Sequence, residues 1–131
     1  MDYSEFIGEV QHRIEAGDMG TAVRNTRAVL TTLGERLQAD EAADLASPLP
    51  GEIGYYLRDA DSGQRFDHAE FLERVADRAG VDEGEAEVRA QAIVALLGEI
   101  VPGGELHDVE GGLPADYEPL FEFVGAEETP W

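Results

Sequence analysis

The sequence predicts an all-α fold: a helical bundle of two tandem repeats related by an approximate twofold axis. Three observations support this prediction. Apolar residues recur at three- and four-residue steps through most of the 131 residues, which is the spacing of one helix face. Glycine and proline clusters interrupt these segments where helices would end. The second half of the chain also repeats the residue order of the first half.

In the first half we expect a helix over 3–15, a long helix from 20 or 21 to 38, and short helices over 41–46 and 52–57. Asp2 and Asp40 are placed to cap the first and third of these helices. Two glycines within 16–20 suit a reversal of the chain. Pro48 and Pro50 end the third helix, because proline has no amide hydrogen to donate.

In the second half we expect helices over 68–79, 83–101, 105–110 and 115–124. Asp67 and Asp82 are placed to cap the first two, and Glu85 completes the capping-box pattern after Asp82. The longest apolar run of the chain, residues 88–101, is apolar around much of its circumference. Such a helix is expected in the core, packed between other helices of the bundle.

These elements form one domain, 1–131, with repeat one at 3–57, a linker at 58–66, repeat two at 67–124 and an acidic tail at 125–131. Each repeat is helix, long helix, short helix, short helix. We expect the two long helices to pack at the centre, with Gly34 and Gly98 permitting their close approach. The predicted core comprises Phe6, Val10, Val29, Leu30, Leu33, Phe71, Val75, Ile93, Val94 and Leu97.

Polar residues also recur at matching positions of the two repeats, as Arg13 with Arg78, Glu35 with Glu99 and Asp44 with Asp108. We interpret them as structural ion pairs, in which the arginine at the end of the first helix reaches a carboxylate from the long or short helix of its own repeat. The alternative is a duplicated anion or ligand site. The three histidines lie in different elements, and no catalytic motif surrounds them. His107 and the acidic residues near it are of types that can hold a metal, but their spacing matches no known ligand motif; these residues are Glu105, Asp108 and Glu110. We therefore expect no catalytic residue, metal site or cofactor.

The chain carries 29 acidic and nine basic residues, a net charge of −20, and all nine basic residues are arginine. This composition indicates a halophilic cytoplasm, where molar salt shortens the Debye length to about 3 Å and screens self-repulsion. An acidic protein of a mesophile is the alternative. The arginines are scattered along the sequence, which argues against direct nucleic acid binding.

The sequence also argues against a membrane-spanning segment, a signal peptide and cysteine chemistry. No apolar run is long enough to span a bilayer, so we expect no membrane partner. The start, MDYSEFIGEV, lacks the basic and then apolar pattern of a signal peptide, which favours the cytoplasm. Cysteine is absent, which excludes disulfides and thiolate catalysis.

The motifs of the second repeat resemble a known family. They are FLERVADRAGV, the acidic entry EAE, AIVALLGEIV, GGELHDV and the closing GLPADYEPLF. Together they resemble the DUF2267 family, and the resemblance covers nearly the whole chain in two copies. The first copy departs from the pattern at GDMGT and at Ser47-Pro48. The resemblance implies an all-helical fold and no particular activity, and haloarchaeal members would fit the composition.

The leading functional hypothesis is a non-catalytic helical module that binds a protein partner or a second copy of itself. The aromatic segment 117–124 either docks on such a partner or packs on its own bundle. One alternative is a small ligand-binding protein or enzyme with a pocket between the repeats. The other is an acidic mimic of DNA, which needs carboxylates spaced like phosphates on one face.

Overall fold

The computed structural model describes residues 1–126 and 131, and the part described is helical, with no strand. The all-α prediction is therefore confirmed. The elements are α1 (Tyr3–Arg13), α2 (Met19–Arg36), α3 (Ala39–Ala46), α4 (Gly51–Arg58), α5 (His68–Ala79), α6 (Glu83–Ile100), α7 (Glu105–Gly111) and the 3₁₀ helix η1 (Ala115–Phe121).

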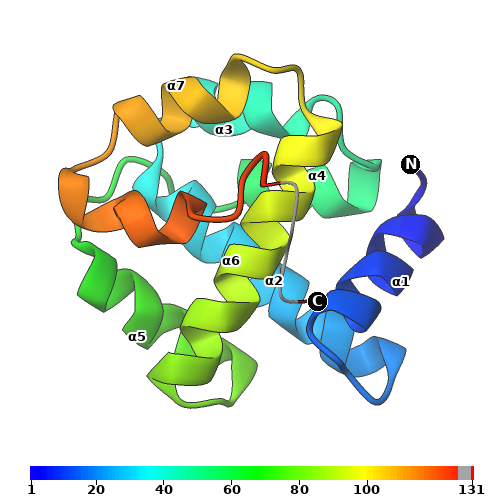
Figure 1. Ribbon diagram of the computed structural model, residues 1–131. Helices are drawn as coiled ribbons and strands as arrows, with labels where there is room; N and C mark the ends of the chain where they lie inside the picture. The colour runs from blue at the N-terminus through cyan, green and yellow to red at the C-terminus, as the bar shows by residue number, and fades with distance from the viewer. Residues whose placement is uncertain (127–130) are drawn as a thin grey trace.

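The two long helices cross in the middle of the molecule, with α6 in front of α2 in Figure 1. Helices α1 and α5 flank them on opposite sides, and α3 lies beside α7 at one end. Helix α2 packs mainly against α5, α4 and α1, and its direct contact with α6 is smaller. The flanking helices therefore supply most of the packing that we had expected between the two long helices.

The apolar faces of these helices meet in one continuous core. All ten residues of the predicted core are at most 1% exposed. Burying an aliphatic or aromatic side chain of this kind typically contributes about 1.5–3 kcal/mol. The buried hydroxyls of Thr26 and Thr32 donate to carbonyl oxygens one turn back in α2, so these polar groups are satisfied inside the core.

Three of the predicted helix caps are present. Asp2 forms a capping box with Glu5, and the carboxylates of Asp67 and Asp82 each accept a backbone N–H three residues ahead. The cap assigned to Asp40 is wrong, because α3 already begins at Ala39.

The turn between α1 and α2 also differs from the prediction. Helix α1 ends at Arg13, two residues early, and Glu15 takes a left-handed conformation with φ of 54°. The expected start of α2 at residue 20 or 21 is likewise late. The helix begins at Met19, because the carboxylate of Asp18 accepts the N–H of Thr21 and caps it.

The role predicted for the two long-helix glycines is wrong. A Cβ at Gly34 would lie 2.7 Å from the carbonyl oxygen of Leu57, at the end of α4, rather than against α6. A Cβ at Gly98 would lie 3.0 Å from a methyl of Val124. Each glycine therefore makes room for the end of the last short segment in its own half of the chain.

The predicted linker, 58–66, is tied to the end of α2. Gly63 and Gln64 donate backbone hydrogen bonds to the carbonyls of Leu37 and Glu35. The carbonyl of Phe66 accepts from Arg36 Nε at 2.9 Å and from the Tyr117 hydroxyl at 2.7 Å. The linker is consequently held against the bundle by both halves of the chain.

The last predicted helix, 115–124, is instead a 3₁₀ helix that ends at Phe121 and contains Pro119. Proline cannot donate the backbone bond that an α-helix needs at this position. The predicted tail includes residues 127–130, which lie outside the described residues. The ring of Trp131 lies 5.6 Å from that of Phe123 and 5.3 Å from the guanidinium carbon of Arg13, measured to ring centroids.

Candidate functional site

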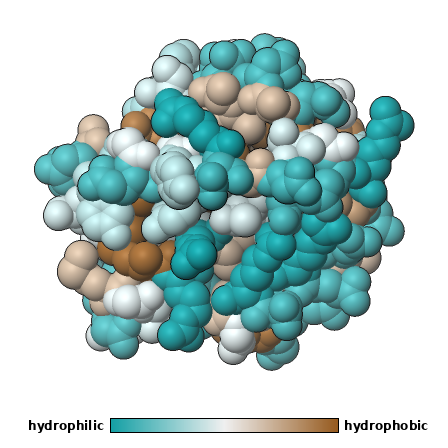
Figure 2. Space-filling model, turned by 180° about the vertical axis from the view of Figure 1, so that it is seen from behind, coloured by the Kyte–Doolittle hydropathy of each residue, from teal (hydrophilic) through white to brown (hydrophobic). Residues whose placement is uncertain are grey.

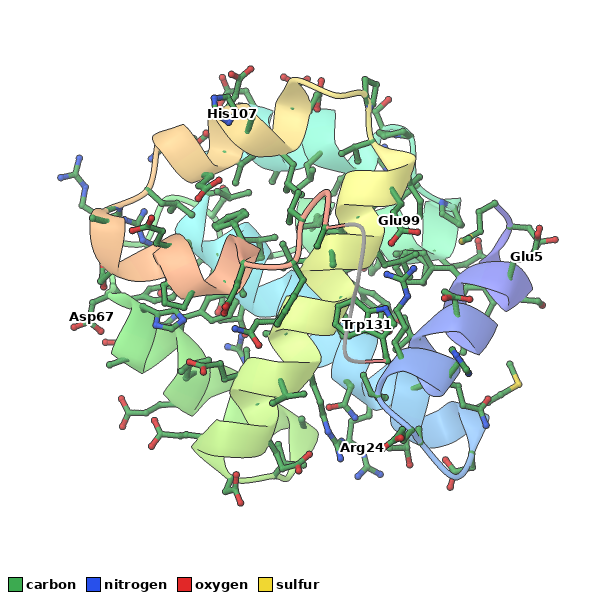
Figure 3. All side chains as sticks on the ribbon, in the orientation of Figure 1. Glu5, Arg24, Asp67, Glu99, His107 and Trp131 are labelled. Atoms are coloured by element: carbon green, nitrogen blue, oxygen red, sulfur yellow. The ribbon has the colours of Figure 1, made fainter. Side chains whose placement is uncertain are left out.

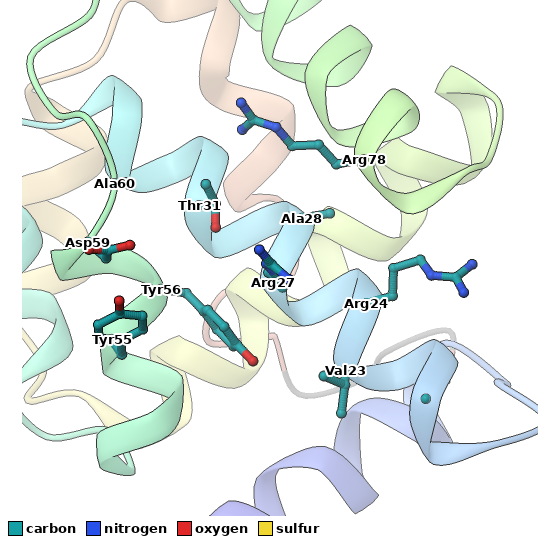
Figure 4. A pocket seen from close by; sticks show the side chains of 11 residues that line it. Val23, Arg24, Arg27, Ala28, Thr31, Tyr55, Tyr56, Asp59, Ala60 and Arg78 are labelled. Atoms are coloured by element: carbon teal, nitrogen blue, oxygen red, sulfur yellow. The ribbon is translucent and has the colours of Figure 1, made fainter.

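The candidate site is a groove between α2 and α4, with a volume of about 820 Å³ (Figure 4). Arg24, Arg27 and Thr31 come from α2, while Tyr55 and Tyr56 come from α4. Arg78 reaches the same groove from α5. We call this feature the arginine groove; the remaining lining residues are Gly20, Val23, Ala28, Asp59 and Ala60.

The helix period brings the groove residues together. Arg24, Arg27 and Thr31 follow one another at three- and four-residue steps, so their side chains share one face of α2. Tyr55 and Tyr56 lie in the last turn and a half of α4. In Figure 4 the tyrosines and Asp59 form one wall, Arg27 extends beside Tyr56, and Arg24 and Arg78 lie on the side away from α4.

The groove gathers three of the nine arginines of a strongly acidic chain. They are scattered along the sequence, and the spacing of Arg24 and Arg27 is the only sequence signal that could have placed two of them together. Arg24 and Arg27 are exposed and make no hydrogen bond or ion pair with the residues that the structure describes. The Asp18 carboxylate feels the charge of Arg24 but forms no ion pair with it, so both guanidinium groups are open to an anion.

Arg78 differs from these two arginines because its charge is already balanced. Its Nη1 and Nη2 donate to the two carboxylate oxygens of Glu35, at 2.6 and 2.8 Å, and Nη1 also donates to the Thr32 hydroxyl. This fork geometry is the strong form of an arginine–carboxylate pair. Most of the uncompensated positive charge of the groove therefore comes from Arg24 and Arg27.

The Tyr56 side chain extends from α4 toward α2 in Figure 4. Burial raises the pKa of Tyr56, the negative charges of ionised Tyr3 and of Glu52 add to this shift, and the positive charge of Arg27 works against it. The phenol is therefore neutral at physiological pH and can donate a hydrogen bond. Tyr55 is 56% exposed and presents its ring to solvent.

The recurrent polar residues are partly brought together, in an unexpected arrangement. Arg78 of α5 pairs with Glu35 of α2, and Arg13 of α1 pairs with Glu99 of α6 through Nη2 and Oε2 at 2.6 Å. Both pairs connect the two halves of the chain, so the expected pairing inside each repeat is wrong. Asp44 is exposed and makes no ion pair among the described residues; the same holds for Asp108.

Glu35 is the central member of a partly buried network. Its carboxylate also accepts from Arg74 at 3.2 Å, and Arg74 is held in turn by Glu70 and Gln64. Burial alone would raise the pKa of Glu35, but the hydrogen bonds and charges of Arg78 and Arg74 outweigh it and lower the pKa. Glu35 is therefore ionised in the folded protein and joins α2 to α5.

The aromatic segment 117–124 packs on its own bundle. Tyr117, Leu120 and Phe121 are buried, and burial raises the pKa of Tyr117 to about 12. The Gln91 amide of α6 also donates to the carbonyl of Pro119. This segment is consequently not an exposed docking surface.

The described residues contain no group of three or more His, Asp or Glu side chains placed to hold a metal ion. In Figure 3, His107 projects outward from α7, far from Asp67 and Glu5. None of the described helices is long and apolar enough to cross a membrane.

Comparison with protein-family models identifies the family of the chain. A family model described as "Uncharacterized conserved protein (DUF2267)" matches residues 3–120, which is most of the chain. The chain belongs to the DUF2267 family. The description of the family names no activity, and no curated protein matched the chain. The geometry of the arginine groove is therefore the main indication of function in this DUF2267 protein.

Proposed function

We propose that this DUF2267 protein is a non-catalytic helical interaction module that holds an anionic group in the arginine groove. One observation carries the proposal: Arg24 and Arg27 lie one turn apart with no carboxylate partner among the described residues, in a chain with 29 acidic residues. Two neighbouring like charges on a helix repel each other by a few tenths of a kcal/mol. A bound anion would remove that cost.

The groove favours binding over catalysis. Its lining holds one carboxylate, Asp59, and no histidine or cysteine. General acid–base catalysis usually needs a pair of titratable groups, and nucleophilic catalysis needs a nucleophile next to a base. Arginines and tyrosines are instead residues that recognise anions and rings.

The anionic group can belong to a free ligand, to a protein partner or to a second copy of the chain. Association through a large apolar surface has less support. The large apolar residues exposed among the described part of the chain are Met1, Met19, Tyr55 and Val88. The face in Figure 2 is mainly hydrophilic, with hydrophobic colour in small separate areas. Polar contacts would therefore dominate such an interface.

We further propose that the two halves arose by duplication and keep an approximate twofold relation. Two facts support this. The equivalent pairs Arg13–Glu99 and Arg78–Glu35 connect the halves reciprocally. Gly34 lies against Ala60 and Gly98 against Val124, which are equivalent positions of their own halves. The net charge of −20 and the lack of lysine support a further proposal, a haloarchaeal-type protein of a salt-rich cytoplasm.

Titration with inorganic phosphate, followed by NMR of the arginine Nε–H signals, tests the proposed function. The signals of Arg24 and Arg27 should shift in a saturable way, and the Arg24→Gln/Arg27→Gln variant should lose the response. Arg58→Gln/Arg65→Gln is a charge-matched control, because both residues lie outside the groove and make no ion pair among the described residues. Equal shifts at all exposed arginines would show nonspecific screening and refute the proposal.

A further inference from the structure

We infer that the arginine groove takes a small ligand in which a phosphate is joined to a planar ring, about the size of a mononucleotide. This inference rests on the proposed function, since it assumes that the groove binds anions. It adds the chemical class of the ligand and separates that class from free phosphate and from polyanions.

The first argument is the distribution of charge inside the groove. Its free positive charge lies on α2, at Arg24 and Arg27, while its one carboxylate, Asp59, follows α4 on the opposite wall. A polyanion that filled the groove would meet Asp59 and be repelled. A ligand with a phosphate at one end and hydrogen-bond donors at the other matches both ends, because Asp59 can accept from hydroxyl or amino groups.

The second argument is the aromatic wall. Tyr55 is one of few large apolar side chains exposed in the described residues, and it stands next to Tyr56 along the same groove. Tyrosine faces bind planar rings by stacking, and stacking is tolerant of the identity of the ring. Inorganic phosphate would leave this wall without a partner.

The third argument concerns the phosphate end. The planar guanidinium fork matches the spacing of phosphate oxygens, and it binds them more specifically than an ammonium group would. Arg24 and Arg27 lie one helical turn apart on α2, and both line the groove. In Figure 4 the guanidinium of Arg24 points away from Arg27, so this exposed side chain would turn toward Arg27 for both to hold one phosphate group. Thr31 lies one turn further along α2 and adds a hydroxyl that can donate or accept.

The size of the groove agrees with this class of ligand. Its volume of about 820 Å³ lies within the range of roughly 300–1,000 Å³ that is typical of small-molecule sites. A single phosphate ion would fill little of it. A ligand with a phosphate, a linking sugar and a ring would span from α2 to α4.

Calorimetric titration of the full chain with four probes tests the inference: adenosine monophosphate, ribose 5-phosphate, adenosine and inorganic phosphate. Adenosine monophosphate should bind about tenfold more tightly than ribose 5-phosphate, because only the former stacks on the tyrosine wall. Tyr55→Ala should reduce its affinity to that of ribose 5-phosphate and leave the affinity of ribose 5-phosphate unchanged. The exposure of Tyr55 makes this a mild change for the fold.

The outcomes separate the two proposals. If adenosine monophosphate, ribose 5-phosphate and phosphate bind alike, and Arg24→Gln/Arg27→Gln weakens all three, the ring is not recognised and the inference is overturned while the proposed function stands. If none of the four probes binds, both are overturned. If Arg58→Gln/Arg65→Gln weakens binding as much as the groove variant does, the site lies elsewhere and both are again overturned.

Discussion

Replacing Glu35 by glutamine should destabilise the fold far more than replacing Glu99, although the two residues occupy equivalent positions in the halves of the chain. The Glu35 side chain is 11% exposed, and it is the carboxylate partner of Arg78. Breaking a buried pair typically costs about 3–5 kcal/mol. Because the Arg78 side chain is 34% exposed, water can solvate part of its charge, and we expect about 2–3 kcal/mol.

Glu99 provides the matched control. Its side chain is 55% exposed, and Arg13 keeps a second carboxylate partner, Glu9, at 2.9 Å. The Arg13 side chain is only 8% exposed, but Glu9 still balances its charge and the carboxylate that is removed is largely solvated, so we expect about 1 kcal/mol or less. For a domain of this length, each kcal/mol shifts the thermal midpoint by about 4 °C. The Glu35 variant should therefore melt about 8–12 °C lower, and the Glu99 variant no more than about 4 °C lower.

Thermal unfolding followed by circular dichroism in molar KCl measures both variants. A double-mutant cycle of Glu35→Gln with Arg78→Gln separates the pair interaction from the other effects of each substitution. Equal melting shifts for the Glu35 and Glu99 variants would refute the reasoning, because burial would then not decide the strength of the pair. A coupling energy near zero would show that the Arg78–Glu35 pair does not help to hold α2 against α5.

Three further predictions concern salt, pH and packing. Helical circular dichroism should fall when KCl is lowered from molar to millimolar, because self-repulsion in a chain of net charge −20 is then unscreened; unchanged helicity would refute the halophilic proposal. The lowered pKa of Glu35 means that its contribution is complete above its ordinary value of 4.5 and is lost as pH falls below it. Acid titrations of the wild type and the Glu35→Gln variant should therefore converge, and parallel curves would contradict this. Gly34→Ala should cost about 1–3 kcal/mol in urea unfolding, because its Cβ would lie 2.7 Å from the Leu57 carbonyl, whereas Gly8→Ala meets open space and should be neutral or stabilising.

The strong negative charge of the chain affects how the arginine groove would attract an anion. The surrounding carboxylates repel anions at a distance, so the groove gains little from long-range attraction. The proposed binding would therefore depend on short-range contacts, namely guanidinium forks and ring stacking. In molar salt such contacts persist better than long-range attraction, because screening acts most strongly beyond the Debye length of about 3 Å.

The candidate site was only partly accessible from the sequence. Arg78 and Glu35 stood out because they recur in both halves, but their partners depend on how the halves are placed. For Arg24 and Arg27 the sequence showed only a spacing that puts both side chains on one face of a helix. The opposite wall, Tyr55 and Tyr56, comes from a helix that begins about 27 residues later in the chain, and only the packing of α4 on α2 brings it there.

By itself, the sequence determined the helical class, the approximate helix positions and the core, because these follow from local periodicity, from capping residues such as Asp67 and from side-chain hydrophobicity. The tertiary structure alone decided which faces meet. In the folded protein the ion pairs Arg13–Glu99 and Arg78–Glu35 connect the two halves, and Gly34 lies against α4 rather than α6. Arginines that are far apart in the sequence line one groove. These contacts depend on how the helices pack against each other, and a local pattern of residues within one helix does not specify that packing.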